Sequence, residues 1–361
     1  MRVLVTGASG LLGGGLARAL AERGDDVTVL QRRAAGLKLR EIRGDVADPA
    51  PVGTAVAGQD AVIHLAAKVN VVGPWAEYER ANILGTTTIV QACRRAGVRR
   101  LVHVSSPSVA NAGMSLVGVG AEPADPYRAR GPYARSKAAA ELIALGADSA
   151  SLRVVAIRPH LVWGPHDTQL TTRIVSRARA GRLPLIGSGS ALVDTTYVDN
   201  AVEALMAALD RCEHAHGQAL VVSNGEPRPI GDILASICAA AGVDPPSRRI
   251  PRRLATVAGT VAEAVWPLRN LLEPGSASTD PPLTRFLVEQ LSSAHWFDQR
   301  HTREVLQWAP RVGIEEGMLK LARWYAAGSA CSSERLSCRD FPPKLPGLAA
   351  EPGQQAPATR Q

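Results

Sequence analysis

Tyr133 and Lys137, four positions apart, are the residues of this chain best suited to acid–base chemistry. On a helix, residues i and i+4 share a face, so both side chains should point into one pocket. The ordinary pKa of a phenol is about 10, and a neighbouring ammonium should lower that pKa towards neutrality. A phenol with such a pKa is an efficient general acid or base. We therefore predict that Tyr133 moves a proton and that Lys137 adjusts its pKa.

Serines upstream of this pair offer a hydrogen-bond donor. The run Ser105-Ser106-Pro107-Ser108 follows an expected central strand, and α/β sheets bind ligands at the carboxyl ends of their strands. A hydroxyl there can donate to a substrate oxygen on which charge develops. We assign this role to Ser106, with Ser105 and Ser108 as alternatives. The other interpretation is that these serines form a polar turn and take no part in catalysis.

A glycine-rich turn occupies residues 6–13, between the first expected strand and the first helix. Gly7 and Gly10 lack a Cβ atom and so permit a tight turn close to a pyrophosphate, while Gly13 lets the helix pack on the strand. Ser9 and Leu11 lie where free helix amides would face phosphates. An ordinary glycine turn is the alternative, but the position within a strand–helix–strand pattern favours dinucleotide binding.

The end of the second expected strand bears on the choice of nicotinamide. NAD enzymes usually place an acid there for the ribose 2′-hydroxyl, whereas this chain has Arg32 and Arg33. A guanidinium pairs well with a 2′-phosphate, so NADP is favoured and NAD is the alternative. The alternative is that both arginines are surface charges with no role in binding the cofactor. Asp45 is expected to accept from the adenine amino group, to cap the following helix, or both.

These signals together predict hydride transfer between a nicotinamide cofactor and a ketone or secondary alcohol. The cofactor supplies the hydride, and the protein supplies orientation and electrostatics. Tyr133 would give a proton to the ketone oxygen or remove it from the alcohol, and Ser106 would position that oxygen.

The elements that must hold these residues alternate between strands and helices. β-branched runs predict strands, and apolar residues at helical spacing predict helices between them. We expect an α/β fold, a doubly wound parallel sheet of Rossmann type with right-handed crossovers and a smaller C-terminal substrate-binding lobe. The expected strands are 2–6, 27–30, 41–43, 61–65, 101–105 and 153–158, with helices at 78–96 and 133–145.

The sequence pattern of the chain changes near residue 160. Residues 1–160 are expected to form the cofactor-binding core, with later segments such as the strand 220–223 completing the sheet. Residues 161–327 are expected to form the substrate-binding lobe, with an apolar lid near Trp75 and at 254–272. From residue 328 the chain is rich in Ser, Pro, Gly and Gln without a hydrophobic period, which predicts a disordered tail.

Composition excludes several other classes. Lys and Arg outnumber Asp and Glu by 41 to 33 in the 361 residues, but the arginine pairs are scattered and not interleaved with aromatic residues, so no nucleic-acid binding is predicted. No apolar run reaches the length of a membrane span, and the N-terminus does not resemble a signal peptide. Five cysteines without metal spacing predict a reduced, cytoplasmic protein with no metal site. The histidines are expected to be ordinary strand or loop residues: His103, His160, His166 and His295.

The combination of motifs resembles the extended short-chain dehydrogenases/reductases over residues 1–325. The motifs that carry it are residues 6–13, 45–46, 64–67, 82–86, 133–137, 158–159 and 198–200. The resemblance implies that Tyr133, Lys137 and Ser106 are catalytic. It also implies cofactor contacts from Gly7, Ser9, Gly10, Leu11, Gly13, Arg32, Arg33, Asp45, Val46, Leu65, Ala66, Ala67, Lys68, Asn82, Tyr133, Lys137 and Pro159.

Within that superfamily, residues 224–227 and 315–317 are similar to the 3β-hydroxysteroid and sterol-4-carboxylate dehydrogenase branch. Residues 106–109, 161–165, 194–197, 223–227 and 282–291 look more like the bacterial 2-alkyl-3-oxoalkanoate reductases of olefin biosynthesis. That resemblance implies NADP-dependent interconversion of a hydrophobic 2-alkyl-3-oxo acid and its 3-hydroxy acid, with a 3β-hydroxysteroid as the alternative substrate. A homodimer through helices near residues 80–96 and 133–147 is a further implication.

Sugar chemistry is a weaker alternative. Nucleotide-sugar dehydratases carry an acidic pair after the catalytic hydroxyl, where this chain has Pro107 and Ser108, and epimerases usually show Tyr-Gly a few residues on, where it has 110–113. A non-catalytic NADP-sensing protein is also disfavoured, because such proteins usually lose the tyrosine or the lysine.

Overall fold

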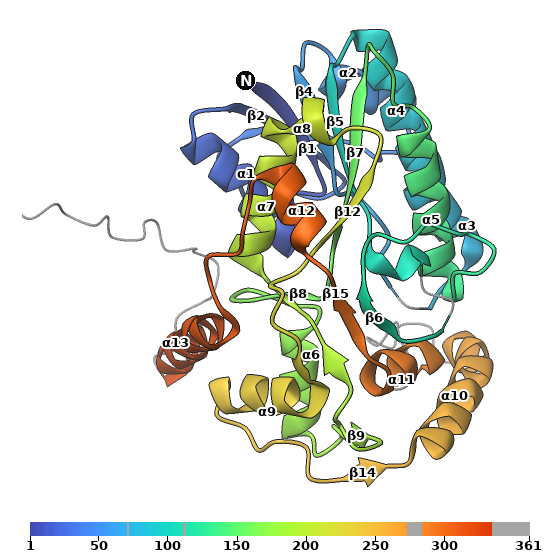
Figure 1. Ribbon diagram of the computed structural model, residues 1–361, viewed down its shortest axis with the longest axis vertical. Helices are drawn as coiled ribbons and strands as arrows, with labels where there is room; N and C mark the ends of the chain where they lie inside the picture. The colour runs from blue at the N-terminus through green and yellow to red at the C-terminus, as the bar shows by residue number, and fades with distance from the viewer. Residues whose placement is uncertain (71, 111–112, 273–283, 334–361) are drawn as a thin grey trace, which may run out of the picture.

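The computed structural model describes residues 1–70, 72–110, 113–272 and 284–333 (Figure 1). Its centre is a sheet of seven parallel strands in the order β12-β7-β5-β4-β1-β2-β3. The strand bounds are β1 Arg2–Thr6, β2 Asp26–Gln31, β3 Arg40–Arg43, β4 Ala61–His64, β5 Arg100–Val104, β7 Arg153–Pro159 and β12 Ala219–Val222. This order, with helices on both faces, confirms the predicted doubly wound α/β fold.

Successive side chains of a strand point to opposite faces, and both faces of this sheet are buried. In β1, Val3 and Val5 join one core cluster and Leu4 joins the other. The first face is covered by α1 (Leu11–Glu22), α7 (Val198–Asp210), α8 (Cys212–Ala215) and α12 (Arg300–Leu306). The second face is covered by α2 (Pro49–Val56), α4 (Gly85–Ala96) and α5 (Gly131–Leu145).

Strand β12 and helix α7 both come from beyond residue 160, so the chain returns to the central sheet after leaving it. The remaining elements lie below the strands' carboxyl ends in Figure 1. They include a sheet of order β13-β10-β15-β6 and two short pairs, β11-β8 and β14-β9. The bounds are β6 Leu116–Val119, β8 Val162–Trp163, β9 Leu185–Ile186, β10 Leu192–Val193, β11 Thr196–Tyr197, β13 Arg228–Pro229, β14 Arg249–Ile250 and β15 His295–Phe297.

Helices α6 (Thr171–Arg179), α9 (Ile230–Ala240), α10 (Arg252–Leu272), α11 (Arg285–Ser292) and α13 (Ile314–Ser333) complete this part. Helix α13 continues past Gly328, where we expected the tail to begin; the rest of that tail lies outside the described residues. Three short helical segments precede α4 or follow β5: α3 (Trp75–Tyr78), the π-helix η1 (Glu79–Leu84) and the 3-10 helix η2 (Pro107–Ala110). Among the described residues, no helix is long and apolar enough to cross a bilayer.

Candidate active site

Helix α5 places Tyr133 and Lys137 on one side, one turn apart, above the carboxyl ends of the central strands. The Lys137 side chain is buried, and its Nζ donates a hydrogen bond to the carbonyl oxygen of Val104, the last residue of β5, at 2.6 Å. The Tyr133 phenol and the Ser106 hydroxyl line the same cavity, and Ser106 is near enough to the phenol to affect its pKa. The structure therefore brings together the three residues that the sequence nominated.

The acidity of Tyr133 differs from our expectation. Burial raises the pKa of the Tyr133 phenol, and the nearby Ser106 side chain opposes that rise only in part. Burial also lowers the pKa of Lys137 to about 8, against a raising effect from Glu141. The predicted lowering of the phenol pKa by Lys137 was wrong for this arrangement, because desolvation of the phenolate dominates and the ammonium is turned to a backbone carbonyl.

The three serines have different surroundings. Ser106 Oγ lies 3.0 Å from Ser108 Oγ and accepts from the Ser108 backbone amide at 3.3 Å. Both residues line the cavity beside Tyr133, whereas Ser105 does not. The Ser105 hydroxyl is buried without a hydrogen-bond partner among the described residues. Ser106 is thus the serine that reaches the phenol, with Ser108 behind it.

The glycine turn has the close contacts that a phosphate cradle requires. Gly7 has a φ of +78°, and a Cβ atom there would lie 2.9 Å from the Ala66 amide nitrogen. A Cβ at Gly13 would lie 2.4 Å from the Gly7 carbonyl oxygen. Helix α1 begins directly after Gly10, which has no side chain to cap the helix. The first amides of α1, including that of Leu11, can therefore bind an anion. This geometry fits a dinucleotide pyrophosphate.

Thr6 ties the glycine turn to the end of β4. Its Oγ1 accepts hydrogen bonds from the Leu65 amide at 3.1 Å and the Ala66 amide at 3.0 Å. The same hydroxyl lies 2.8 Å from His64 Nδ1, and His64 Nε2 lies 3.1 Å from Thr86 Oγ1. The turn and the 65–68 segment are therefore held at a fixed distance, a feature that the sequence analysis did not identify.

Asn82 links the cofactor-side loop to the helix of Tyr133. It lies buried in the π-helix η1, and its Oδ1 accepts from the Lys68 amide at 2.7 Å while its Nδ2 donates to the Lys68 carbonyl at 3.2 Å. Nδ2 also donates to Ser136 Oγ at 2.9 Å, and that hydroxyl donates to the Tyr133 carbonyl at 2.9 Å. π-helical turns are rare and often found at functional sites, and here the turn aims an amide at α5.

The residues expected near the adenosine differ in their burial and in their hydrogen bonds. Arg32 and Arg33 are exposed immediately after β2. Neither polar atom of the buried Gln31 side chain has a partner among the described residues. The Asp45 carboxylate accepts from the Ala47 amide at 2.9 Å. The residue that precedes α2 is Asp48, so the alternative that Asp45 caps this helix was wrong.

The other nominated residues surround the same strand ends. Ser9 is exposed in the glycine turn, Val46 is buried after β3, Ala67 is half-buried beside Ala66, and Pro159 ends β7 at the cavity.

A mostly apolar cavity of about 360 Å³ opens beside Tyr133 and Ser106. Its walls come from segments far apart in the chain, chiefly α6, α9 and α11. The apolar lining residues are Pro107, Leu116, Pro159, Leu161, Leu170, Ile174, Leu183, Ile230, Ile233, Leu234, Ile237, Leu287, Leu291 and Phe297. Among the polar lining residues, Arg173 and Arg177 lie one turn apart on α6 and are half-buried. The cavity therefore suits an apolar molecule with an anionic group.

His160 follows β7 and His295 lies in β15, and both also line the cavity, with their rings 6.3 Å apart. One expectation about this wall was wrong. The expected lid at 254–272 is helix α10, and no described residue of α10 lines the cavity; α11 stands between them. Trp75 instead stacks on Arg135, with 5.3 Å between the guanidinium carbon and the ring centre, outside the cavity lining.

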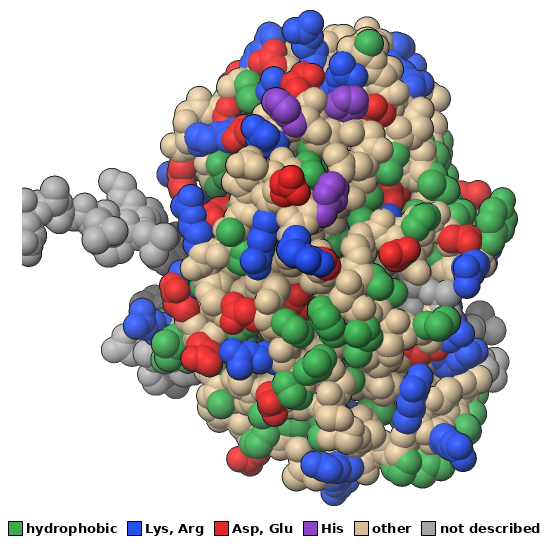
Figure 2. Space-filling view, in the orientation of Figure 1, with side chains coloured by type: hydrophobic (Ala, Val, Ile, Leu, Met, Phe, Trp, Pro, Cys, Tyr) green, Lys and Arg blue, Asp and Glu red, His purple; other side chains and the backbone are tan. Residues whose placement is uncertain are grey.

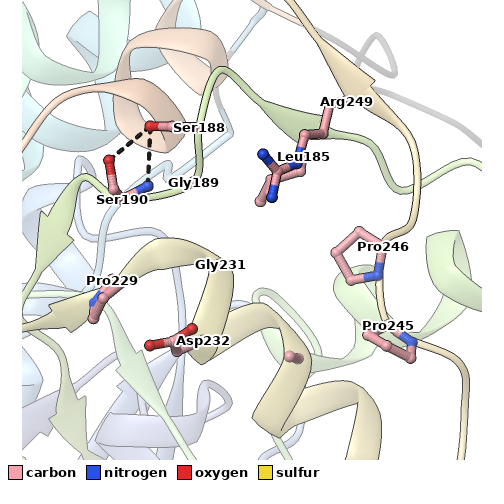
Figure 3. A pocket seen from close by; sticks show the side chains of 11 residues that line it. Leu185, Ser188, Gly189, Ser190, Pro229, Gly231, Asp232, Pro245, Pro246 and Arg249 are labelled. Atoms are coloured by element: carbon pink, nitrogen blue, oxygen red, sulfur yellow. Dashed lines mark hydrogen bonds between the residues drawn. The ribbon is translucent and has the colours of Figure 1, made fainter.

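A second hollow lies beside the N-terminal half of α9 (Figure 3). It is lined by the Ser188-Gly189-Ser190 turn, Asp232, Arg249 and three prolines, and the two serine hydroxyls lie 2.6 Å apart. It holds none of the residues nominated for chemistry.

Comparison with known proteins agrees with this geometry. Residues 3–223 match the model of the NAD dependent epimerase/dehydratase family. The chain is 42% identical to 2-alkyl-3-oxoalkanoate reductase of Stenotrophomonas maltophilia, covering 91% of this chain and 100% of that protein. It is 30% identical to 3-beta-hydroxysteroid dehydrogenase of Mycolicibacterium neoaurum, covering 90% and 91%.

Among solved structures, MoeE5 in complex with UDP-glucose and NAD superposes with a TM-score of 0.70 at 27% identity, covering 91% of this chain and 100% of that one. The curated relatives named here are a reductase and a dehydrogenase that act on keto or hydroxyl groups, which supports NAD(P)-dependent oxidoreductase chemistry. The chain therefore belongs to the NAD-dependent epimerase/dehydratase family, that is, to the extended short-chain dehydrogenases/reductases.

Proposed function

We propose that this protein reduces the 3-keto group of a hydrophobic 2-alkyl-3-oxo acid to the 3-hydroxy acid, using NADP. The observation that carries the proposal is the opening of the Tyr133, Lys137 and Ser106 site onto an apolar cavity. A bound dihydronicotinamide would supply the hydride. The 42% identity to a 2-alkyl-3-oxoalkanoate reductase over nearly the whole chain supports the same substrate class.

The proposed roles follow from the contacts of each side chain. Ser106, which lines the cavity beside the phenol, donates to the substrate oxygen as negative charge develops there. Tyr133, whose pKa is raised by burial, is protonated near neutrality and gives its proton to the same oxygen. Lys137 lies one helical turn away with its ammonium on the Val104 carbonyl, where it holds the end of β5, two residues before Ser106, against α5.

The side chains that line the cavity favour an acid with long alkyl chains over a sterol as the substrate. Leucine and isoleucine side chains from α9 and α11 form the apolar wall, and Arg173 and Arg177 lie on the α6 wall where a carboxylate can be held. A plain 3β-hydroxysteroid carries no anionic group for these arginines, whereas a sterol-4-carboxylate does.

NADP preference rests on Arg32 and Arg33, which follow β2 without an acidic residue at its end. Replacing Arg32 by Ser should raise KM for NADPH about tenfold or more and leave KM for NADH nearly unchanged, since one charge-assisted hydrogen bond is worth about 1.5–3 kcal/mol. Arg95→Gln, on the exposed last turn of α4, is the matched control.

The test of the substrate is a paired assay at fixed NADPH. A racemic 2-alkyl-3-oxo acid and a 3-ketosteroid are compared by the loss of nicotinamide absorbance. Turnover of the keto acid with little turnover of the steroid supports the proposal. Preference for the steroid would assign the chain to the hydroxysteroid dehydrogenases, and no turnover of either would overturn the proposal.

The cellular setting that we propose is the cytoplasm. Cys93, Cys212 and Cys238 are buried free thiols, and burial raises the pKa of the first two to about 12, which suits a reducing cytoplasm.

A homodimer through α4 and α5 is the expected assembly. Leu142 on α5 is 48% exposed and is the side chain to replace by Glu in a sedimentation experiment.

A further inference from the structure

Helix α10 carries a row of exposed apolar side chains. Leu254, Val257, Val261 and Val265 are 63%, 63%, 56% and 53% exposed. At 100° per residue they fall within about 80° of the helix circumference. Isolated exposed apolar residues are ordinary, but four in line on one helix form a continuous patch. We call these four residues the α10 stripe.

The opposite side of α10 is the one that packs on the protein. Ala255 is fully buried in a cluster with Ile186 and Val288. A Cβ at Gly259, one turn later, would lie 3.0 Å from the Arg285 amide nitrogen, so α10 and α11 are in close contact there. Glu263 also accepts from the Arg285 amide, at 2.7 Å. The α10 stripe is therefore not needed to hold the helix in place.

Arginines flank the stripe at its N-terminal end. Arg248 and Arg249 precede α10, Arg252 and Arg253 begin it, and all four are exposed. Between Asp244 and Glu263 the chain contains these four arginines and no acidic residue. Figure 2 shows Lys and Arg side chains gathered at the lower right of the molecule, where Figure 1 places α10. An apolar row beside concentrated positive charge is the pattern of a helix that lies flat on an anionic bilayer.

We propose that α10 docks this protein on the surface of an anionic lipid bilayer, with the α10 stripe inserted at the headgroup boundary. This inference goes beyond the reaction and stands without it. It also places the cavity near the bilayer, because Thr284, Leu287 and Leu291 of the α11 segment line the cavity and α11 packs on α10. A long-chain substrate would then have a short path from the membrane.

Charge favours a bilayer over a second copy of the chain. In a two-fold contact the same patch of each copy enters one interface, so both sets of four arginines would be brought into it together. Like charges brought together in this way oppose association. Anionic headgroups instead neutralise them.

The test is flotation of the full chain with vesicles of phosphatidylcholine containing phosphatidylglycerol, against phosphatidylcholine alone. Wild type should float with the anionic vesicles and lose most binding in high salt. Val257→Ser with Val261→Ser should weaken partitioning at least about tenfold, and Leu319→Ser, an equally exposed residue on α13 (60%), should not.

Arg252→Gln with Arg253→Gln tests the charge separately, and covers the case in which the serine variant fails to fold. Each arginine is expected to contribute about fivefold to binding. The matched control replaces the exposed Arg95 and Arg323 by Gln. Failure of wild type to float, or equal loss in variant and control, would overturn the proposal. So would a wild-type dimer that the serine variant converts to monomer without any change in vesicle binding.

Discussion

Arg158 of β7 and Glu141 of α5 form a two-bonded ion pair that is almost entirely buried. Arg158 Nε donates to Glu141 Oε2 at 2.8 Å and Nη2 donates to Oε1 at 2.5 Å, with side chains 2% and 1% exposed. Nη1 donates to the Glu122 carbonyl at 2.7 Å. Glu141 lies one turn after Lys137 and raises its pKa. The pair therefore fixes the helix of the candidate catalytic residues against the sheet.

Removing one member of this pair should be costly. Glu141→Gln leaves a buried guanidinium without its counter-charge and is expected to lower the free energy of unfolding by about 3–5 kcal/mol. Chemical denaturation of wild type and variant measures the difference. Asp60→Asn, which breaks the exposed ion pair with Arg2, is the control and should cost at most about 1 kcal/mol. Equal losses at the two sites would contradict the assignment of a structural role to the buried pair.

Tyr133→Phe tests the proposed proton transfer. The phenyl ring keeps the packing of the phenol, so NADPH binding should be preserved while kcat falls about 10²–10⁴-fold. Steady-state kinetics and a fluorescence titration of the cofactor separate the two effects. Tyr127→Phe, at a tyrosine that is 93% exposed, is the control. A Tyr133→Phe variant with unchanged kcat would remove Tyr133 from the mechanism.

The parts of the site that were predictable from sequence are local. The glycine turn, the spacing of Tyr133 and Lys137 and the strands that precede them each occupy a few consecutive residues. Backbone geometry over such a stretch is set largely by residue type, as the φ of +78° at Gly7 illustrates.

The parts that were not predictable depend on distant packing. The raised pKa of Tyr133 arises from burial, which a helix pattern does not reveal. The cavity walls come from segments between residues 106 and 297, and whether α10 or α11 faces the cavity depends on how the two helices pack on each other. His160 was set aside because the proposed mechanism already has a proton donor in Tyr133 and no metal spacing links the histidines.

Gly7→Ala tests the phosphate cradle. The positive φ alone costs an alanine about 1–2 kcal/mol, and its Cβ would also meet the Ala66 amide at 2.9 Å. We expect both a loss of stability above 2 kcal/mol, roughly, and a large rise in the Kd for NADPH. Thermal unfolding and calorimetric titration measure the two quantities.

Gly24→Ala isolates the backbone cost. Gly24 has a φ of +94° with no atom within 4 Å of an added Cβ, and it lies in the turn after α1. This variant should lose about 1 kcal/mol and bind NADPH normally. If Gly7→Ala behaved like Gly24→Ala in both measurements, close approach at the cradle would not be required.

Buried histidines should make the fold sensitive to acid. Burial lowers the pKa of His64 to about 3, and lowers that of His103 well below its usual value, with the nearby Lys137 charge adding to the effect. Between pH 6.5 and the folded pKa, the unfolded chain binds protons that the folded chain does not. Stability should therefore fall as the pH decreases through this window.

His103→Leu separates this contribution from the rest. Both ring nitrogens of His103 are buried without a partner among the described residues, so the replacement should cost little at pH 7. Below pH 6.5 it should reduce the pH dependence of the unfolding free energy by about 1.4 kcal/mol per pH unit, the value for one proton. The control is His301→Leu, because His301 is exposed and its Nε2 lies 2.8 Å from the Gln218 side-chain oxygen. Parallel stability–pH curves for wild type and His103→Leu would show that the pKa of His103 does not differ between the folded and unfolded protein.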